Sequence, residues 1–146
     1  MIAYFDASAL VKRHVDERGS RETIEFAARA ELVATSLVSR AEVAAALAKA
    51  VRVKLLEERE ARKAQRAFAA QWPDIARIPV TEALVSRAET LAWEYGLRGY
   101  DAVQLASAVL FQESLGTAVR LATFDRQLWN AARGVGFEPW PEKPPQ

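Results

Sequence analysis

Four short apolar runs, separated by segments of helical character, limit the fold of this chain more than any other feature. The runs cover Ile2–Phe5, Leu32–Thr35, Ala76–Val80 and Val119–Phe124. None shows the strict alternation of apolar and polar residues that marks a strand with one solvated face. Strands that are buried on both faces and joined through helices form parallel sheets. We therefore predict an α/β protein whose parallel sheet is covered by helices on both faces.

The segments between the apolar runs carry helix signals. Helices are predicted from near Ser8, over Ser20–Arg29, from near Ser36, over Glu57–Gln71, over Glu82–Tyr95, and from Asp101 and Asp125. The helix over Glu57–Gln71 is expected to end at Trp72 because Pro73 cannot continue it. Gly136–Trp140 is predicted as an edge strand, and Pro139–Gln146, which holds four prolines, is expected to fray.

The composition excludes several classes of protein. The chain has 146 residues, of which 51% are hydrophobic and 27% charged, as is typical of one globular domain. We place this domain at residues 1–140 and a Pro-rich tail at 141–146. The chain has no cysteine, which excludes disulfides, thiol nucleophiles and cysteine-based zinc sites. No apolar stretch is long enough to span a membrane, and Asp6 comes too early for a secretory signal, so a cytoplasmic protein is expected.

Four carboxylates are predicted to meet at one edge of the sheet. Asp6 and Asp125 each follow an apolar run directly, Glu42 lies early in the helix after another run, and Asp101 opens a helix. The carboxyl ends of parallel strands share one edge, and ligands bind there where the strand order reverses. Like charges a few ångströms apart oppose ionisation, and a divalent cation relieves that repulsion. A site of oxygen ligands suits Mg²⁺ or Mn²⁺ rather than zinc.

Each of these acids also has a local interpretation. Aspartate is among the best helix N-caps, so Asp6, Asp101 and Asp125 can each serve only the start of a helix. Ser39 and Glu42 have the spacing of a capping box, in which the two side chains satisfy the first backbone N–H groups of a helix. Sequence position alone does not decide between these interpretations and a shared site.

Three other polar residues have two interpretations each. Ser8 and Thr123 each lie two residues from an aspartate, and they either orient a ligand or a carboxylate or are ordinary turn hydroxyls. The single histidine, His14, has no partner for a metal site, and a solvated helix residue is expected there.

Four motifs together resemble the PIN-domain family. In chain order they are YFDASALVK, SLVSRAEVAAAL, LRGYDAVQLASA and LATFDRQL. Within that family the chain is most similar to the VapC ribonuclease toxins of VapBC toxin–antitoxin pairs, and the resemblance extends to about Trp140. It implies a three-layer, Rossmann-like α/β/α sandwich with a central, mainly parallel sheet. It also implies a Mg²⁺-dependent endoribonuclease site.

The resemblance assigns the acidic site and its supporting hydroxyls to these residues: Asp6, Glu42, Asp101, Asp125, Ser8 and Thr123. Our hypothesis is that Asp6 and Asp101 hold the principal metal ion and that Asp125 completes its shell. Glu42 would then orient the attacking water or a second ion. The chain has Gln104 where members of the family often have histidine, and no loss of activity is expected from this difference.

Binding of RNA requires positive charge near the acids. The net charge of +1 neither requires nor excludes a nucleic-acid partner. Arg13 and Arg40 are candidate phosphate contacts. Seven basic residues between Lys49 and Arg66 either steer the RNA backbone or form a solvated helical hairpin. The apolar positions of the same segment are interpreted as core or, alternatively, as a face for a partner: Val51, Leu55, Leu56 and Phe68.

The resemblance also implies partners, namely an RNA substrate, a cognate antitoxin that covers the site, and a second copy in a homodimer. A PIN-fold module without activity is the main alternative. A phosphoacceptor receiver domain also places acids at strand ends, but it needs a second acid beside Asp6 and a lysine after its last strand. The chain has neither.

Overall fold

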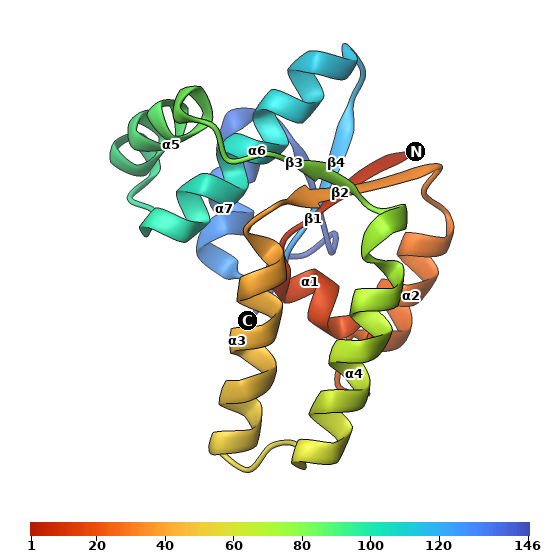
Figure 1. The fold of residues 1–146 in the computed structure, drawn as a ribbon. Coiled ribbons are helices and arrows are strands. Elements are labelled where there is room, and N and C mark those ends of the chain that lie inside the picture. Colours follow the sequence, from red (N-terminus) through yellow and green to blue (C-terminus); the bar gives the residue numbers. More distant parts are fainter.

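Five parallel strands form one sheet at the centre of the protein. In the computed structural model, which describes residues 1–146, they are β1 (Ile2–Phe5), β2 (Leu32–Ser36), β3 (Ala76–Ile78), β4 (Val119–Ala122) and β5 (Glu138–Trp140). Their order across the sheet is β3-β2-β1-β4-β5, and each neighbouring pair is parallel (Figure 1). The four predicted strands and the predicted edge strand are all present, and the parallel sheet is confirmed.

The helices alternate with the strands along the chain. They are α1 (Ala7–Lys12), α2 (Ser20–Ala28), α3 (Ser39–Arg52), α4 (Glu58–Gln71), the 3₁₀ turn η1 (Trp72–Asp74), α5 (Glu82–Tyr95), α6 (Gly99–Leu115) and α7 (Arg126–Val135). One predicted start is wrong. Helix α6 begins at Gly99 with Arg98 as its N-cap, so Asp101 lies inside the first turn and does not open the helix.

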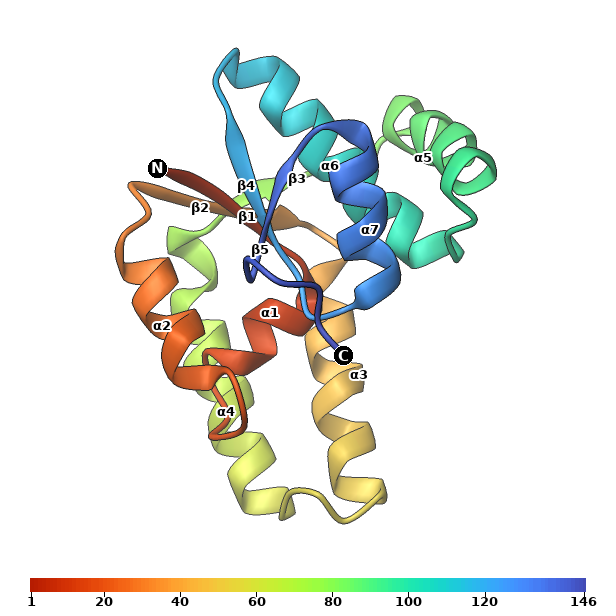
Figure 2. The same ribbon diagram turned by 180° about the vertical axis from the view of Figure 1, so that it is seen from behind.

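The helices cover both faces of the sheet. In β1 the side chains of Ala3 and Phe5 enter a core formed with α1 to α4, whereas Tyr4 enters a second core formed with α5, α6 and α7. Opposite faces receive successive residues because side chains alternate along a strand. Figures 1 and 2 show the two helical layers with the sheet between them. The expected three-layer α/β/α sandwich is confirmed.

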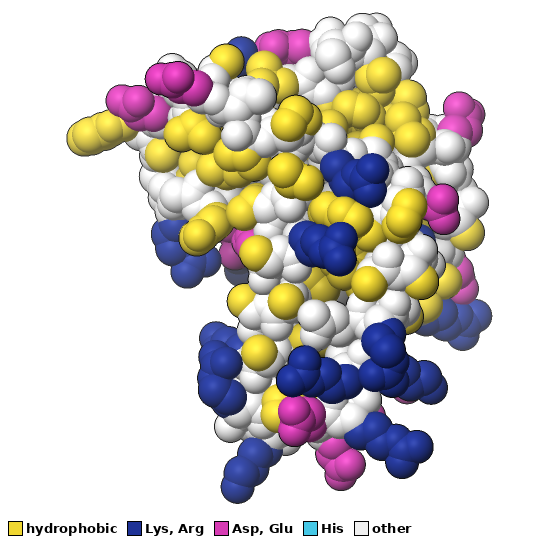
Figure 3. Space-filling view, in the orientation of Figure 1, with side chains coloured by type: hydrophobic (Ala, Val, Ile, Leu, Met, Phe, Trp, Pro, Cys, Tyr) yellow, Lys and Arg dark blue, Asp and Glu magenta, His cyan; other side chains and the backbone are white.

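Helices α3 and α4 extend as a hairpin away from the sheet (Figure 1). Basic side chains surround this hairpin, with a few acidic side chains among them (Figure 3). At the turn between the two helices, Leu55 is 78% exposed. Of the four apolar residues interpreted as core, Phe68 is buried, Val51 and Leu56 are half-buried against the core, and Leu55 is exposed.

The end of the chain is more ordered than its composition suggests. Pro139 belongs to β5 and is buried, so the prediction that the chain frays from Pro139 onward is wrong. The indole N–H of Trp129 donates to the carbonyl of Pro141 at 2.8 Å, and Arg120 pairs with Glu142 at 3.1 Å. None of the helices combines the length and the apolar character that crossing a lipid bilayer requires.

Candidate active site

Asp6 and Asp125 are brought near each other because the strands before them are neighbours. β1 pairs with β4, and the backbone N–H of Asp6 donates to the carbonyl of Ala122 at 3.1 Å. The sheet order reverses between these strands, since β2 and β3 lie on one side of β1 and β4 and β5 on the other. Ligands of open α/β sheets bind at the carboxyl ends of the strands at such a reversal. Both aspartates stand at that position.

Asp6 is a buried carboxylate held by three donors. It is only 4% exposed. Its Oδ1 accepts from the Ser8 hydroxyl at 2.7 Å and from the Ala9 N–H at 2.9 Å, and its Oδ2 accepts from the Thr123 hydroxyl at 2.6 Å. Burial raises the pKa of Asp6 to about 6, the three donors oppose this rise, and the charge of Glu42 adds to it. Asp6 is therefore both an N-cap and a constrained, easily protonated acid.

The hydroxyls of Ser8 and Thr123 join the loop after β1 to the loop after β4. While Ser8 donates to Asp6, its oxygen accepts from the Phe124 N–H at 2.8 Å. The Thr123 oxygen accepts from the Asp125 N–H at 3.0 Å, and the two hydroxyl oxygens lie 3.4 Å apart. Since each hydroxyl contacts both loops, these residues fix the position of the Asp6 carboxylate relative to Asp125.

Asp101 and Asp125 share one guanidinium. Asp125 caps α7 by accepting from the Leu128 N–H at 2.8 Å through Oδ1. Its Oδ2 lies 3.6 Å from an Nη of Arg98, and the Nε of the same arginine lies 3.4 Å from Oδ2 of Asp101. Burial raises the pKa of Asp101, repulsion from Asp125 adds to the rise, and Arg98 opposes it. Arg98 is therefore a cation that compensates two of the acids.

Glu42 does not form the capping box that its spacing allows. The N-cap of α3 is Val38, no side chain caps the helix, and Ser39 is already the first helical residue. The Ser39 hydroxyl instead lies 2.7 Å from Oγ1 of Thr35 and accepts from Nε2 of Gln104 at 2.9 Å. Oε1 of Glu42 accepts from the same Nε2 at 2.6 Å. The Glu42 side chain is thus directed toward α6 and not toward its own backbone.

The four carboxylates occupy one electrostatic neighbourhood. Burial raises the pKa of Glu42 and Asp101 adds to the rise, while Asp101 itself is affected by Asp125 and Asp6 by Glu42. No three acidic or histidine side chains are close enough together to form a ready-made metal site. The donor set is entirely oxygen, and Arg98 supplies positive charge to two of its members, so the chemistry of the residues suits a hard divalent cation.

The two arginines expected to contact RNA pack against aromatic rings and do not pair with the acids. Arg13 lines a hollow with residues at the amino end of β2, away from the carboxyl ends of the strands, and its guanidinium packs over Phe5 at 5.7 Å. Arg40 packs over the Trp72 ring at 5.7 Å. The structure gives neither arginine a contact with the acids, whereas Arg98 contacts two of them.

The expectation of a solvated His14 is wrong. His14 lies beyond the end of α1, its ring packs edge-on against Phe68 at 5.7 Å, and its Nε2 is buried without a hydrogen-bond partner. Burial lowers the pKa of His14 to about 4, and the neighbouring Arg13 adds to this effect. The imidazole is therefore neutral at physiological pH and acts as a packing residue.

Sequence reasoning missed three residues that hold the acids in place. In the sequence, Gln104 stands out only as a substitution for histidine, Tyr4 belongs to an apolar strand, and Arg98 precedes a helix without any motif of its own. Gln104 did leave a signal, because an amide in the middle of the apolar stretch of α6 has to find buried partners. Arg98 left none, since an exposed arginine before a helix is common.

Comparison with known proteins decides the family. The chain matches the PIN domain family over residues 3–134. The chain belongs to the PIN-domain family. Two curated relatives of this PIN domain come from strains of Mycobacterium tuberculosis, Ribonuclease VapC45 from CDC 1551 / Oshkosh and Ribonuclease VapC49 from ATCC 25618 / H37Rv. Each is 34% identical over 135 residues, which are 92% of this chain and 92% of the relative.

A solved structure agrees with the fold of this PIN domain. The protein titled "Toxin-antitoxin complex from Klebsiella pneumoniae" superposes with a TM-score of 0.63 and 23% sequence identity, over 92% of each chain. This likeness confirms the architecture. The resemblance of the four sequence motifs to VapC-type PIN domains is confirmed by the curated relatives, which match nearly the whole chain.

Proposed function

We propose that this PIN domain is a divalent-metal-dependent endoribonuclease that acts in the cytoplasm as the toxin of a type II toxin–antitoxin pair. The observation that carries the proposal is that Asp6 and Asp125 follow neighbouring strands at the strand-order reversal, while Asp101 shares Arg98 with Asp125 and the charge of Glu42 acts on Asp6. The curated relatives are named ribonucleases of the VapC type, which agrees with this chemistry. An inactive PIN-fold module would have no need of a complete acidic set.

In the proposed hydrolysis of a phosphodiester, the aspartates bind the metal ion and Arg98 contacts the substrate. Asp6, Asp101 and Asp125 would hold Mg²⁺ or Mn²⁺, which supplies positive charge for the phosphoryl oxygens and lowers the pKa of a bound water. The Asp6 carboxylate stays fixed because three donors hold it. Arg98 now pairs with Asp101 and Asp125, so it would have to release them for this role, and its exposed side chain would then be free to pair with a phosphate of the substrate.

Glu42 is suited to orient the attacking water. Burial raises the pKa of its carboxyl, which makes the carboxylate a better proton acceptor near neutral pH. One oxygen of Glu42 is engaged by Gln104, and the structure gives the other oxygen no protein donor. That second oxygen is available to accept a hydrogen bond from a water molecule.

The decisive experiment compares two aspartate variants. Asp101→Asn is expected to lower Mg²⁺-dependent cleavage of RNA by roughly 100-fold or more, because it removes a charged ligand while keeping the shape of the side chain. Asp16→Asn, at an exposed position outside the site, is expected to cleave at the wild-type rate. EDTA should abolish cleavage by wild type and control alike. An Asp101→Asn variant that cleaves as fast as the control would refute the assignment.

Phosphates of the RNA are proposed to contact the α3–α4 hairpin as well as Arg98. Basic side chains surround the hairpin (Figure 3). Arg52 lies ten residues after Glu42 on α3, which places it about 15 Å along the helix axis. This distance exceeds the screening length of about 8 Å at physiological ionic strength. The hairpin therefore acts by direct contact with the backbone at some distance from the cut.

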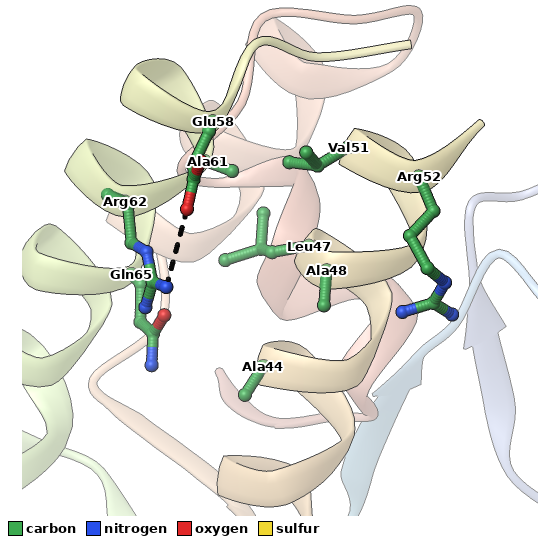
Figure 4. Close-up of a pocket in the computed structure, with 9 residues that line it drawn as sticks. All are labelled: Ala44, Leu47, Ala48, Val51, Arg52, Glu58, Ala61, Arg62 and Gln65. Atoms are coloured by element: carbon green, nitrogen blue, oxygen red, sulfur yellow. Dashed lines mark ion pairs between the residues drawn. The ribbon is translucent and has the colours of Figure 1, made fainter. Parts of the chain in front are cut away.

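The antitoxin is proposed to bind along the same hairpin. A cleft of about 200 Å³ lies between α3 and α4 (Figure 4). Its apolar floor includes Leu47, Val51 and Ala61, and its rim carries the pair formed by Arg62 and Glu58 at 3.5 Å. Arg52 also lines the cleft, but its side chain extends away from α4 (Figure 4). An antitoxin segment with apolar side chains and acidic neighbours fits this combination. The relative titled as a toxin–antitoxin complex has the same fold, which supports such a partner.

A variant of the cleft tests this partner. Val51→Arg is expected to fill the cleft with charge, so that the co-expressed antitoxin no longer neutralises the toxin, while purified protein retains its cleavage of RNA. The control is Val53→Arg, which carries the same change at a position that does not line the cleft. Neutralisation of Val51→Arg to the same extent as Val53→Arg would exclude the cleft as the antitoxin site.

A homodimer is proposed through the outer face of α5 and α6. This face has an apolar hollow of about 340 Å³ lined by Val85, Ala88, Ala92, Tyr100 and Val103, among other residues. Hydrophobic side chains cover this part of the molecule in Figure 3, at the place where Figure 1 shows α5 and α6. Apolar patches of this kind mark association surfaces in proteins that are otherwise polar outside.

A further inference from the structure

Gln104 is a buried amide that forms hydrogen bonds with three residues on two other elements, β1 and α3. It lies on α6 and is 1% exposed. Its Oε1 accepts from the Tyr4 hydroxyl of β1 at 2.6 Å, and its Nε2 donates to Ser39 of α3 at 2.9 Å and to Oε1 of Glu42 at 2.6 Å. Both N–H bonds of the amide nitrogen are thereby occupied.

The partners of Gln104 determine which way its amide points. A carboxylate only accepts hydrogen bonds, so the amide nitrogen has to face Glu42. The buried hydroxyl of Tyr4 is protonated and donates to the oxygen on the other side. A flipped amide would set two oxygens against each other at Glu42 and turn the amide N–H groups toward the Tyr4 hydroxyl, which would lose Oε1 as its acceptor. Tyr4 therefore fixes the orientation in which Gln104 serves Glu42.

The network continues to β1, the strand that ends just before Asp6. The Ser39 hydroxyl contacts Thr35 of β2 at 2.7 Å, and Thr35 donates to the carbonyl of Phe5 at 2.6 Å. Asp6 follows Phe5 directly. The Glu42 carboxylate is thus tied through buried groups to the backbone beside the principal acid.

We propose that Gln104 is a positioning residue for the reaction: oriented by Tyr4, it holds one oxygen of Glu42 so that the other faces the reacting water. This inference rests on the proposed nuclease function. It predicts that Gln104 acts only through Glu42, whereas a purely structural amide would affect folding and leave turnover unchanged.

Gln104→Leu is the main variant, and the same helix offers a matched control. Gln112 also lies on α6, and its Oε1 accepts from the Val119 N–H at 2.9 Å. It follows Asp101 by eleven residues, which is about 16 Å along the helix axis. Gln112→Leu therefore removes an amide hydrogen bond of α6 without touching Glu42. We expect Gln104→Leu to lower kcat by roughly 10- to 100-fold with KM changed less than about threefold. For Gln112→Leu we expect kcat within about twofold of wild type.

A double-mutant cycle distinguishes positioning from support of the fold. Under single-turnover conditions, Gln104→Leu is expected to cause no further loss, within about twofold, in a Glu42→Gln background. Equal losses in the wild-type and Glu42→Gln backgrounds would overturn the inference. Tyr4→Phe, which removes one hydroxyl from the relay, supplies a milder variant if Gln104→Leu does not fold. It should lower kcat severalfold only when Glu42 is present.

A second measurement keeps this inference separate from the nuclease proposal. The side-chain amide protons of Gln104 are expected at shifted NMR frequencies that change in Glu42→Gln and in Tyr4→Phe, whereas those of Gln112 stay unchanged. Wild-type protein without metal-dependent cleavage would defeat the proposed function, and this spectrum would still report whether the relay exists. Gln104 signals that are insensitive to both substitutions would defeat the relay itself.

Discussion

Asp6 is the most deeply buried carboxylic acid of this protein, and its burial opposes ionisation. It is 4% exposed, and its pKa is raised to about 6 from an ordinary value of 3.8. Well below pH 3.8 the carboxyl is protonated in both the folded and the unfolded chain. As the pH rises through 6, the folded protein has to bury a charge that the unfolded chain keeps in water. The stability of the metal-free protein is therefore expected to fall between pH 4 and pH 6.

Asp6→Asn should remove this dependence. In EDTA, the difference in free energy of unfolding between Asp6→Asn and wild type is expected to change by roughly 3 kcal/mol in favour of the variant between pH 4 and pH 7. The reason is that the variant lacks the carboxyl whose pKa is raised by about two units. Urea titrations at several pH values measure this difference. Asp16→Asn, at an exposed position, should give a flat difference. A flat difference for Asp6→Asn too would show that Asp6 buries no charge.

Residue roles in this site depended on contacts that no short stretch of sequence contains. Asp6 and Asp125 were predicted at strand ends because each directly follows an apolar run. The capping-box spacing of Glu42 misled because α3 begins one residue too early for Ser39 to be its N-cap. The role of Gln104 depends on hydrogen bonds to Tyr4, Ser39 and Glu42, which lie far from Gln104 in the sequence. This role is therefore defined only in the folded protein.

At the scale of elements, the sequence predicts a helix end correctly where the capping residue itself bonds the nearby backbone or adopts a left-handed conformation. Helix α5 has the predicted bounds because the Thr81 hydroxyl accepts from the Leu84 N–H at 3.2 Å and Gly96 ends the helix with a φ of 64°. Helix α6 begins before its predicted start because Arg98 is an N-cap without a side-chain hydrogen bond. Because this N-cap makes no side-chain hydrogen bond, the sequence contains no capping residue that would predict the start of α6.

The start of α2 is an element boundary coupled to the site. Gly19 is its N-cap with a φ of 89°, and an added Cβ would lie 3.1 Å from the ring of Phe124, which stands between Thr123 and Asp125. Gly19→Ala is expected to lower the free energy of unfolding by roughly 1–3 kcal/mol through this backbone strain and contact. Chemical denaturation measures the loss.

Gly99 supplies the matched control for this substitution. It has no positive φ, and an added Cβ would meet nothing within 4 Å. Gly99→Ala is therefore expected to be neutral or to stabilise by less than about 1 kcal/mol. Equal destabilisation by the two variants would mean that the left-handed backbone at Gly19 carries no strain for alanine.

At the scale of the whole molecule, the strand order decides where the acids meet. The apolar runs predict parallel strands, but a run does not encode its neighbours in the sheet. In the structure β4 passes β2 and β3 to pair with β1, and this crossing places Asp125 near Asp6. The outer surfaces were equally beyond prediction, because α5 and α6 place apolar residues from separate segments on one exposed face.

That exposed face gives the prediction about assembly. Trp93 is 88% exposed on α5, and Tyr100 is 65% exposed beside the apolar hollow of α5 and α6. A two-fold dimer buries the same patch on both copies, so one substitution changes the interface twice. Trp93→Glu is expected to convert the proposed dimer to a monomer in light scattering coupled to gel filtration. Leu55→Glu, at a 78% exposed apolar position on the far hairpin, should leave the proposed dimer intact. Dissociation by Leu55→Glu alone would move the interface to the hairpin.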